Sequence, residues 1–455
     1  MQSDVASGRA LHSATGMLAA YVAAAAPEAL PETVRKEAAR TFLNWVGCAV
    51  GGSRHKTVDI ALAALAPFSG PAQASVLGRS ERLDPLHAAL INGISSHVFD
   101  FDDTHLRTVI HPGGPVVSAL LAFAEHRKVR GPDFVNALVL GVEVECRIGN
   151  AVFPEHYDIG WHITGTAGVF GAAAAIGKLL NLDAERMAWA LGIAASQPVG
   201  LREMFGSMTK SFHPGRAAQN GMTAALLAAH GYTSSARALE AKRGWMNVLS
   251  TQQDPTQITE GLGVRYEILA NSYKPFACGI VIHPVIDACV QLRKSDGIEA
   301  ASIRSVALRV HPLVLELTGK TEPQTGLEGK FSVFHAASIA LIEGDGGERQ
   351  FSDRAVLDPA VIDLRRRVQA TIDPALAPDA AAVTLTLADG RVVEKQVEHA
   401  IGSRTRPMTD ADLEAKFTGL AEAYLGAAGT RRLLYLCWRV GALDDVAAVA
   451  EAART

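Results

Sequence analysis

The sequence predicts a mainly α-helical fold, in which a large all-helical domain carries a smaller α+β lid domain. Apolar residues recur at helical spacing through residues 15–250, where strand patterns are almost absent. Strand-type alternation begins near residue 264, and an Asp389-Gly390 turn signal joins two of the later strands. We expect three segments: an all-helical domain over 1–263, the lid over 264–400, and C-terminal helices over 401–455 that rejoin the first domain.

Composition and charge exclude several classes of protein. The chain has 455 residues, 48% hydrophobic and 20% charged, as expected for a globular protein of two or three domains. The net charge of -4 and the scattered lysines and arginines argue against a nucleic-acid partner. The Ala-rich run at 18–26 is too short and too weakly apolar to span a bilayer, and no charged-then-apolar leader is present. We therefore expect a cytoplasmic protein without a membrane partner.

The pattern of the five cysteines also indicates a cytoplasmic protein. They are odd in number and widely spaced, and no C-x-x-C pair occurs. This pattern is typical of reduced thiols and not of a disulfide framework.

Helical periodicity locates the elements of the first domain. Small residues at three- and four-residue intervals, such as Gly165, Gly168 and Gly171, would let these helices pack closely. The expected helices cover residues 33–50, 86–98, 115–124, 133–152, 166–180, 184–195 and 216–230.

The lid mixes both patterns. Its expected strands cover residues 264–268, 305–310, 383–387 and 392–397, and its expected helices cover 284–292 and 331–342. The C-terminal helices are expected over 410–425, 430–440 and 443–453.

The polar stretch at 99–115 interrupts two apolar helices and is typical of an active-site loop. It contains Asp100, Asp102, Asp103, His105 and His111. Acids at the C-terminal end of a helix are disfavoured by the helix dipole, so these carboxylates need partners. Such a local conflict often marks a functional site. The alternative is that Asp102 and Asp103 only cap or solvate the loop.

Four histidines are expected just before helices: His111, His162, His213 and His283. Helix N-termini offer unpaired N–H groups and the positive end of a dipole, which suit a carboxylate or phosphate. The same dipole keeps a nearby imidazole neutral and able to move a proton near pH 7. The alternative for each single histidine is an ordinary loop or capping residue.

Lys210 and Lys274 add cations beside these histidines, as a site for a carboxylate requires, although a solvated lysine is the alternative for both. No phosphate-binding loop and no H-E-x-x-H zinc helix occur, and 165–171 lacks the strand that precedes a dinucleotide fingerprint. We predict a site without a metal or other cofactor. A helical metallohydrolase that uses the acids and histidines of the 99–115 loop is the rival.

Several motifs together resemble the MmgE/PrpD family across nearly the whole chain. They are Asp100-Phe101-Asp102-Asp103-Thr104 with His111-Pro112, Gly160-Trp161-His162, Thr209-Lys210 with His213-Pro214-Gly215 and Ala217-Ala218, Tyr273-Lys274-Pro275, and Lys330-Phe331-Ser332. The family includes 2-methylcitrate dehydratase, cis-aconitate decarboxylase and iminodisuccinate epimerase. The resemblance implies a helical domain with an α+β lid, a homodimer, a site between the domains, and proton transfer beside a carboxylate without a redox cofactor.

The resemblance also implies site residues. Where the decarboxylase branch has a further histidine this chain has Gly279, and 313–317 contains no tyrosine, which argues against decarboxylation. The expected catalytic residues are Asp100, His111, His162, Lys210 and Lys274, and the expected substrate-binding residues are Asp103, His105, His213, Tyr273 and His283.

The function predicted from these residues is that of a dehydratase, a lyase that removes a proton α to a carboxylate of a small di- or tricarboxylic acid. Reprotonation on the opposite face would instead give an epimerase of a dicarboxylate. A metallohydrolase, or a non-catalytic dimer that binds a small acid, would also be compatible with these residues.

Overall fold

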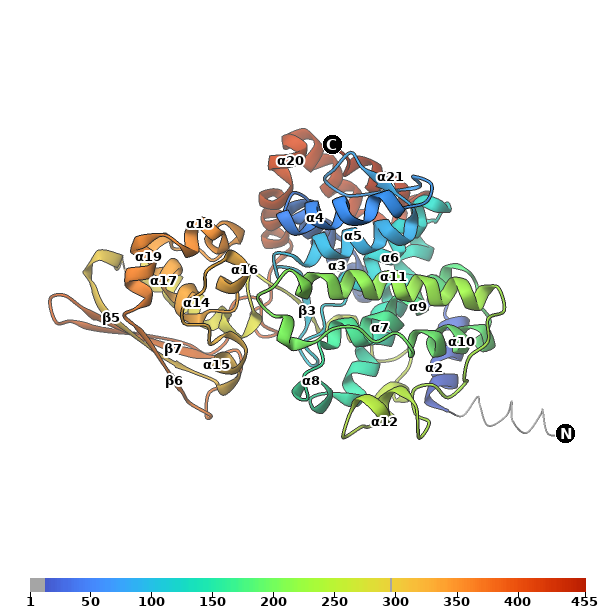
Figure 1. The fold of residues 1–455 in the computed structure, drawn as a ribbon, viewed down its shortest axis with the longest axis horizontal. Helices are drawn as coiled ribbons and strands as arrows, with labels where there is room; N and C mark the ends of the chain where they lie inside the picture. The colour runs from blue at the N-terminus through green and yellow to red at the C-terminus, as the bar shows by residue number, and fades with distance from the viewer. Residues whose placement is uncertain (1–12, 295–296) are drawn as a thin grey trace.

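The computed structural model describes residues 13–294 and 297–455, so the first twelve residues of the predicted helical domain lie outside it. A large helical lobe carries a smaller lobe built on a four-stranded sheet (Figure 1). The predicted fold class, mainly α with a smaller α+β part, is confirmed.

The large lobe contains the helices that the periodicity predicted, together with shorter ones. Its helices are α2 (Ala14–Ala24), α3 (Glu32–Gly52), α4 (Lys56–Leu65), α5 (Pro85–His97), α6 (Gly113–His126), α7 (Gly131–Val152), α8 (Glu155–Asp158), α9 (Ile163–Leu179), α10 (Ala184–Ala194), α11 (Thr209–Ala229), α12 (Trp245–Leu249) and α13 (Thr256–Thr259). Two short antiparallel pairs join them: β1 (Ala74–Ser75) with β2 (Arg82–Leu83), and β3 (Asp103–His105) with β4 (Asn271–Tyr273).

Helix α9 forms the centre of this lobe. All of its residues from Ile163 to Gly177 are buried, and α6, α7 and α11 pack around it. Small side chains permit this packing, because a Cβ atom added to Gly221 of α11 would lie 2.5 Å from Ala172 Cβ. The close packing expected from the glycines and alanines is confirmed.

The smaller lobe has a mixed sheet with strand order β6-β5-β7-β8. Strand β5 pairs parallel with β6 and antiparallel with β7, and β7 turns into β8 at the predicted Asp389-Gly390 turn. Helices α14 and α17 contact the sheet, and α19 packs on α17 (Figure 1). The elements are α14 (His283–Lys294), β5 (Ile303–Val310), α15 (Pro312–Thr318), α16 (Gly326–Gly329), α17 (Val333–Glu343), α18 (Asp353–Val356), α19 (Pro359–Arg365), β6 (Val368–Ile372), β7 (Ala381–Leu387) and β8 (Val392–Val397).

Several strand assignments differ from the prediction, and the short strands β1 to β4 were not predicted. The expected strand at 264–268 is a turn that leads into a short 3₁₀ helix, and Val264 is 84% exposed, so its β-branched side chain has no sheet to pack against. Strand β6 was not predicted. Its residues lie at a sheet edge and are mostly exposed, which weakens the alternating pattern.

Helix α11 begins at Thr209 and not near 216, so His213 lies inside the helix and does not precede it. Pro214 also lies inside, although a proline there removes a helical hydrogen bond, at a cost of about 3 kcal/mol. Close packing offsets this cost. A Cβ on Gly114 would lie 2.9 Å from Pro214 Cβ, and a Cβ on Gly215 would lie 2.3 Å from the Leu90 carbonyl oxygen.

The C-terminal helices α20 (Asp410–Trp438) and α21 (Ala447–Ala452) return to the large lobe, where α20 packs along α3. Gly426 interrupts α20 with a φ of 66°, which accounts for the two helices expected over this stretch. No helix among residues 13–294 and 297–455 is both long and apolar enough to cross a bilayer. All five cysteines are buried free thiols.

The contact between α5 and α11 depends on glycine. A Cβ added to Gly93 would lie 2.4 Å from Gly215 Cα. We expect Gly93→Ala to lower the free energy of unfolding by about 1–3 kcal/mol, because the two helices must separate. Chemical denaturation measures this change. The matched control is Gly419→Ala on the exposed side of α20, where nothing lies within 4 Å and the expected change is a small gain. Equal losses in both variants would contradict the packing argument.

Candidate active site

The loop between α5 and α6 is held by a partner that lies far away in the sequence. Its strand β3 pairs with β4, with Asp103 opposite Tyr273. This pairing brings Lys274, the residue after β4, against the start of the loop. Asp100 there adopts a left-handed conformation with φ 50°, which turns the chain away from α5.

Asp100 is the carboxylate that both predicted lysines share. Its Oδ1 accepts hydrogen bonds from Lys210 Nζ at 2.8 Å and from Lys274 Nζ at 2.7 Å. All three side chains are buried. Burial alone would raise the pKa of Asp100, but the two ammonium groups outweigh it and hold this pKa well below the usual range. Asp100 is therefore ionised, and the two lysines are the partners that this helix-end acid requires.

A cavity of about 50 Å³ opens on this triad, between the two lobes. One end is polar, and the opposite wall is apolar and aromatic. A wider groove of about 870 Å³ adjoins it, since Phe205 and Leu317 line both. The cavity is lined by Asp100, Thr104, Val109, His111, Tyr157, His162, Phe205, Lys210, Lys274, Gly279, Ile280, Val281, Leu317, Thr318 and Phe331.

His111 precedes α6, as predicted, and its tautomer is fixed. Its Nδ1 lies 2.8 Å from the Asp103 carbonyl oxygen, which can only accept, so Nδ1 carries the proton. The Asp103 side chain is itself held by the Gly113 N–H at 3.0 Å. The lone pair of His111 Nε2 is left free, and Nε2 lies 4.0 Å from Asp100 Oδ1. His111 therefore has the form of a general base.

His162 also precedes a helix, α9, and is supported from behind by His213. Their Nδ1 atoms are 2.8 Å apart, so one donates and the other accepts. Burial and the mutual repulsion of the two rings hold the pKa of His162 well below its usual value. Burial, with charges nearby, lowers the pKa of His213 to about 3. Both rings are neutral near pH 7.

His97, the last residue of α5, was not among the predicted site residues. Its Nδ1 lies 2.7 Å from Asp102 Oδ2, and its Nε2 lies 3.0 Å from Lys210 Nζ. Because the lysine donates to Nε2, the proton on Nδ1 is donated to Asp102. Burial lowers the pKa of His97 to about 4, although Asp102 opposes this shift. The sequence carried one signal, a histidine one turn before an acidic loop, but the residue was counted as part of an apolar helix.

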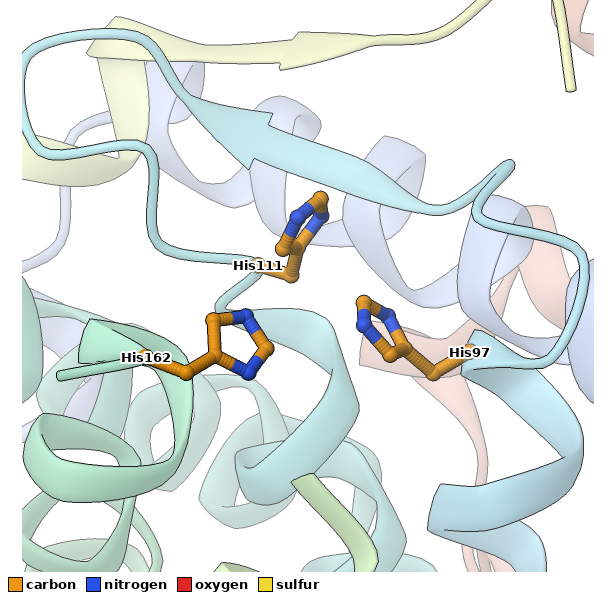
Figure 2. A group of neighbouring side chains, drawn as sticks. All are labelled: His97, His111 and His162. Carbon is orange, nitrogen blue, oxygen red and sulfur yellow. The ribbon is translucent and has the colours of Figure 1, made fainter. Parts of the chain in front are cut away.

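Three imidazoles converge on one space, as Figure 2 shows for His97, His111 and His162. Each can offer a ring nitrogen within 4.8 Å of the others, a set that could hold a divalent transition metal. However, Lys210 already donates to His97 Nε2 and brings a positive charge to this space. A cation would have to displace that ammonium group. A second set, His97, Asp100, Asp102 and His111, includes two carboxylates, but Asp100 is already paired with both lysines and Asp102 with His97. The two lysine charges therefore favour an anion over a metal ion in this space.

Five predicted binding residues do not line the cavity. His105 Nε2 lies 3.1 Å from Glu267, behind the loop, and the Tyr273 hydroxyl donates to Glu37 at 2.6 Å. Asp102 and Asp103 are fully buried, so they do not solvate the loop, but Asp103 accepts from the Gly113 N–H at the start of α6, as the capping alternative expects for that residue. The residues outside the cavity lining are Asp103, His105, His213, Tyr273 and His283.

The aromatic wall was also missed by the sequence reasoning. Phe205 and Phe331 come from different lobes and stack with ring centroids 5.4 Å apart, and Tyr157 completes this side of the cavity. Isolated aromatic residues in loops and short helices carry no sequence pattern that assigns them to a site.

Asp100→Asn removes the shared carboxylate without straining the backbone, because asparagine tolerates the left-handed conformation. We expect its effect on the free energy of unfolding to depend on pH. Two buried ammonium groups lose their counter-ion, so we expect a loss of about 3–5 kcal/mol of stability at pH 7. The folded-state pKa of Asp100 lies well below 3.8, so this contribution is constant above about pH 4 and shrinks as pH falls further.

Urea denaturation of wild type and variant between pH 7 and 3.5 measures the effect. The control is Asp389→Asn, which removes an exposed carboxylate paired with Arg391 and is expected to leave stability unchanged. A similar stability of Asp100→Asn and wild type at pH 7 would contradict the role of Asp100 as the shared counter-ion.

Comparisons with known proteins agree with this architecture. The cis-aconitate decarboxylase of Aspergillus terreus is 26% identical over 480 residues, which cover 99% of this chain and 98% of that protein. The human cis-aconitate decarboxylase is 26% identical over 438 residues, covering 91% and 89%. The 2-methylcitrate dehydratase of Cupriavidus necator is 26% identical over 365 residues, covering 74% and 75%.

Two family models match consecutive parts of the chain. The MmgE/PrpD N-terminal domain matches residues 16–258, and the MmgE/PrpD C-terminal domain matches residues 276–440. The resemblance found in the motifs is confirmed. This protein belongs to the MmgE/PrpD family.

Proposed function

We propose that this protein is a lyase, a dehydratase that removes a proton α to a carboxylate of a small di- or tricarboxylic acid. The observation that carries the proposal is the position of His111 Nε2, which lies in a buried cavity 4.0 Å from the carboxylate that holds both lysines. The names of the relatives support the reaction class, because a decarboxylase and a dehydratase are both lyases and act on acids of this type.

Substrate binding uses the charge of the lysines. A carboxylate of the substrate takes the remaining N–H group of Lys210, while Asp100 holds both ammonium groups in place. Lys274 donates to Asp100 and to the Cys278 carbonyl oxygen, so it contributes its charge and not a free N–H group. When His111 Nε2 removes the α-proton, negative charge moves onto that carboxylate. Preorganised cations in a site with little water stabilise such charge most strongly in the transition state.

Loss of the β-hydroxyl requires an acid. The low pKa of Asp100 makes it unsuitable, because it has no proton to give near pH 7. In the tautomer in which His213 donates between the two Nδ1 atoms, His162 Nε2 carries a proton. That proton goes to the leaving hydroxyl, which departs as water while the C–O bond breaks and the C=C bond forms. His162 is left as an imidazolate, whose charge the nearby Lys210 ammonium group stabilises, and His111 holds the α-proton as an imidazolium. Solvent resets both histidines after product release.

One observation favours a second candidate, an epimerase. The His111 and His162 rings both line the cavity, with centroids 6.4 Å apart. A base on one face and an acid on the other can return the proton with inverted configuration and no loss of water. The same carbanion serves both outcomes, so the substrate's leaving group decides between them.

We also propose that the protein is a homodimer in the cytoplasm. The five buried free thiols suit a reducing compartment. The dimer rests on the family resemblance alone, and light scattering of the purified protein tests it.

The reaction is tested by NMR in D2O, with chelator-treated protein and a panel of hydroxy-, imino- and unsaturated di- and tricarboxylic acids. Loss of water supports the dehydratase, and α-deuterium uptake without loss of water supports the epimerase. Activity that returns only with an added divalent metal would favour the metallohydrolase. Binding of an acid without exchange or turnover in either condition would favour a non-catalytic binder.

The base is tested by His111→Asn. The asparagine amide can still donate to the Asp103 carbonyl but has no Nε2, so we expect kcat to fall at least about 100-fold with little change in Tm. Deuterium exchange into substrate should fall with it. The control is His230→Asn at the exposed end of α11, which should keep wild-type turnover. A folded and fully active His111→Asn protein would remove His111 from the mechanism.

A further inference from the structure

The Lys210 ammonium group has three N–H donors, and the protein fixes two of them. One goes to Asp100 Oδ1 at 2.8 Å and one to His97 Nε2 at 3.0 Å. On the remaining side lie the rings of Phe205 and Phe331, with centroids 5.3 and 5.5 Å from Nζ. Aromatic rings accept no conventional hydrogen bond, so the third donor is available to a ligand in the cavity.

His97 can accept the hydrogen bond from Lys210, and so hold the ammonium group in this orientation, in only one tautomer. If its Nε2 carried the proton, two donors would face each other and the lysine would be displaced. Asp102 prevents this, because its Oδ2 accepts the proton on His97 Nδ1 at 2.7 Å. Both side chains are almost fully buried, so water does not compete for these contacts.

We propose that His97, locked by Asp102, is a positioning residue that aims the free N–H of Lys210 at the substrate carboxylate. The identity of that ligand as a carboxylate rests on the proposed function. The hydrogen bonds that link Asp102, His97 and Lys210 are independent of the proposed function. His97 does not line the cavity but a separate void of about 10 Å³ that it shares with Asp100 and Lys210, so it acts through Lys210 and not on the substrate. A residue that only fills space would not need an Nε2 that accepts a hydrogen bond from Lys210.

The charge state of Lys210 reports this role directly. The titratable groups around it are Asp100 and Asp102 from the loop, His97 from α5, His162 from α9, His213 from α11, and Lys274 after β4. Burial lowers the pKa of Lys210, and Asp100 opposes this shift. Removing the acceptor at His97 Nε2 should lower the pKa of Lys210 further, because the ammonium form loses a hydrogen bond.

Two substitutions of His97 test the roles of its two ring nitrogens separately. In His97→Gln the amide oxygen reaches the position of Nε2 and can still accept from Lys210. In His97→Asn the amide reaches only the position of Nδ1 and keeps the contact with Asp102. We expect the pKa of Lys210 to fall by about one in His97→Asn and to stay near wild type in His97→Gln. NMR of 13Cε-lysine protein, with the signal assigned by Lys210→Arg, measures both without a substrate.

Turnover provides the second readout once an acid is identified. We expect kcat/KM to fall about 10- to 100-fold in His97→Asn, with the high-pH limb of its profile shifted to lower pH, and to be largely retained in His97→Gln. His156→Asn is the control for loss of a buried histidine. Its ring contacts Leu249 and Thr166 outside the cavity, and it should cost stability without moving the titration of Lys210.

Equal titration of Lys210 in wild type, His97→Gln and His97→Asn would overturn the proposal, whatever the enzyme's substrate. If Lys210 titrates as expected but no acid of the panel is turned over, the proposed function fails and the positioning role of His97 stands.

Discussion

The site depends on one buried carboxylate that holds two ammonium groups. Isolated ions are strongly disfavoured in a protein interior, so Asp100, Lys210 and Lys274 are stable there only as a set. They come from the end of α5, the first turn of α11 and the residue after β4. The three segments are therefore tied together by charge as well as by packing. The left-handed turn at Asp100 and the close contact of α5 with α11 help to place Asp100 within hydrogen-bond distance of Lys210.

Burial affects the histidines differently from Asp100 and the two lysines, because an imidazole can lose its charge near pH 7. Burial lowers the pKa of His97 and of His162, so both imidazoles stay neutral near pH 7, basic at one nitrogen and acidic at the other. In each of the three rings that converge on the site, the rear nitrogen is fixed by the protein: by Asp102 for His97, by a backbone carbonyl for His111, and by His213 for His162. The protein thus decides which proton each ring can give or take before any ligand arrives.

Local patterns were enough to predict most helices and the acidic loop, and the family resemblance singled out Asp100, His111, His162, Lys210 and Lys274, which all line the cavity. Local patterns failed where distant contacts decide the outcome. His213 was assigned to a loop because prolines end isolated helices, but packing against Gly114 keeps Pro214 inside α11. His97 was missed because its partners are set by tertiary contacts: a turn places Asp102, and α11 delivers Lys210.

The charge balance of the cavity limits how an acid can lie in it. Asp100 neutralises one of the two lysine charges, so the polar end is matched by a single further carboxylate. The opposite wall is apolar, and an unpaired carboxylate against it would cost several kcal/mol. The adjoining groove does not supply a full set of counter-charges, because Asp158, Glu203 and Glu316 line it together with Arg202 and Lys320, and Arg202 is paired with Glu316. Additional carboxylates must therefore reach solvent through this groove. An acid held in this way has its α-carbon between the anchored carboxylate and the groove, beside the base, so the charges that bind the ligand also select the proton that is removed.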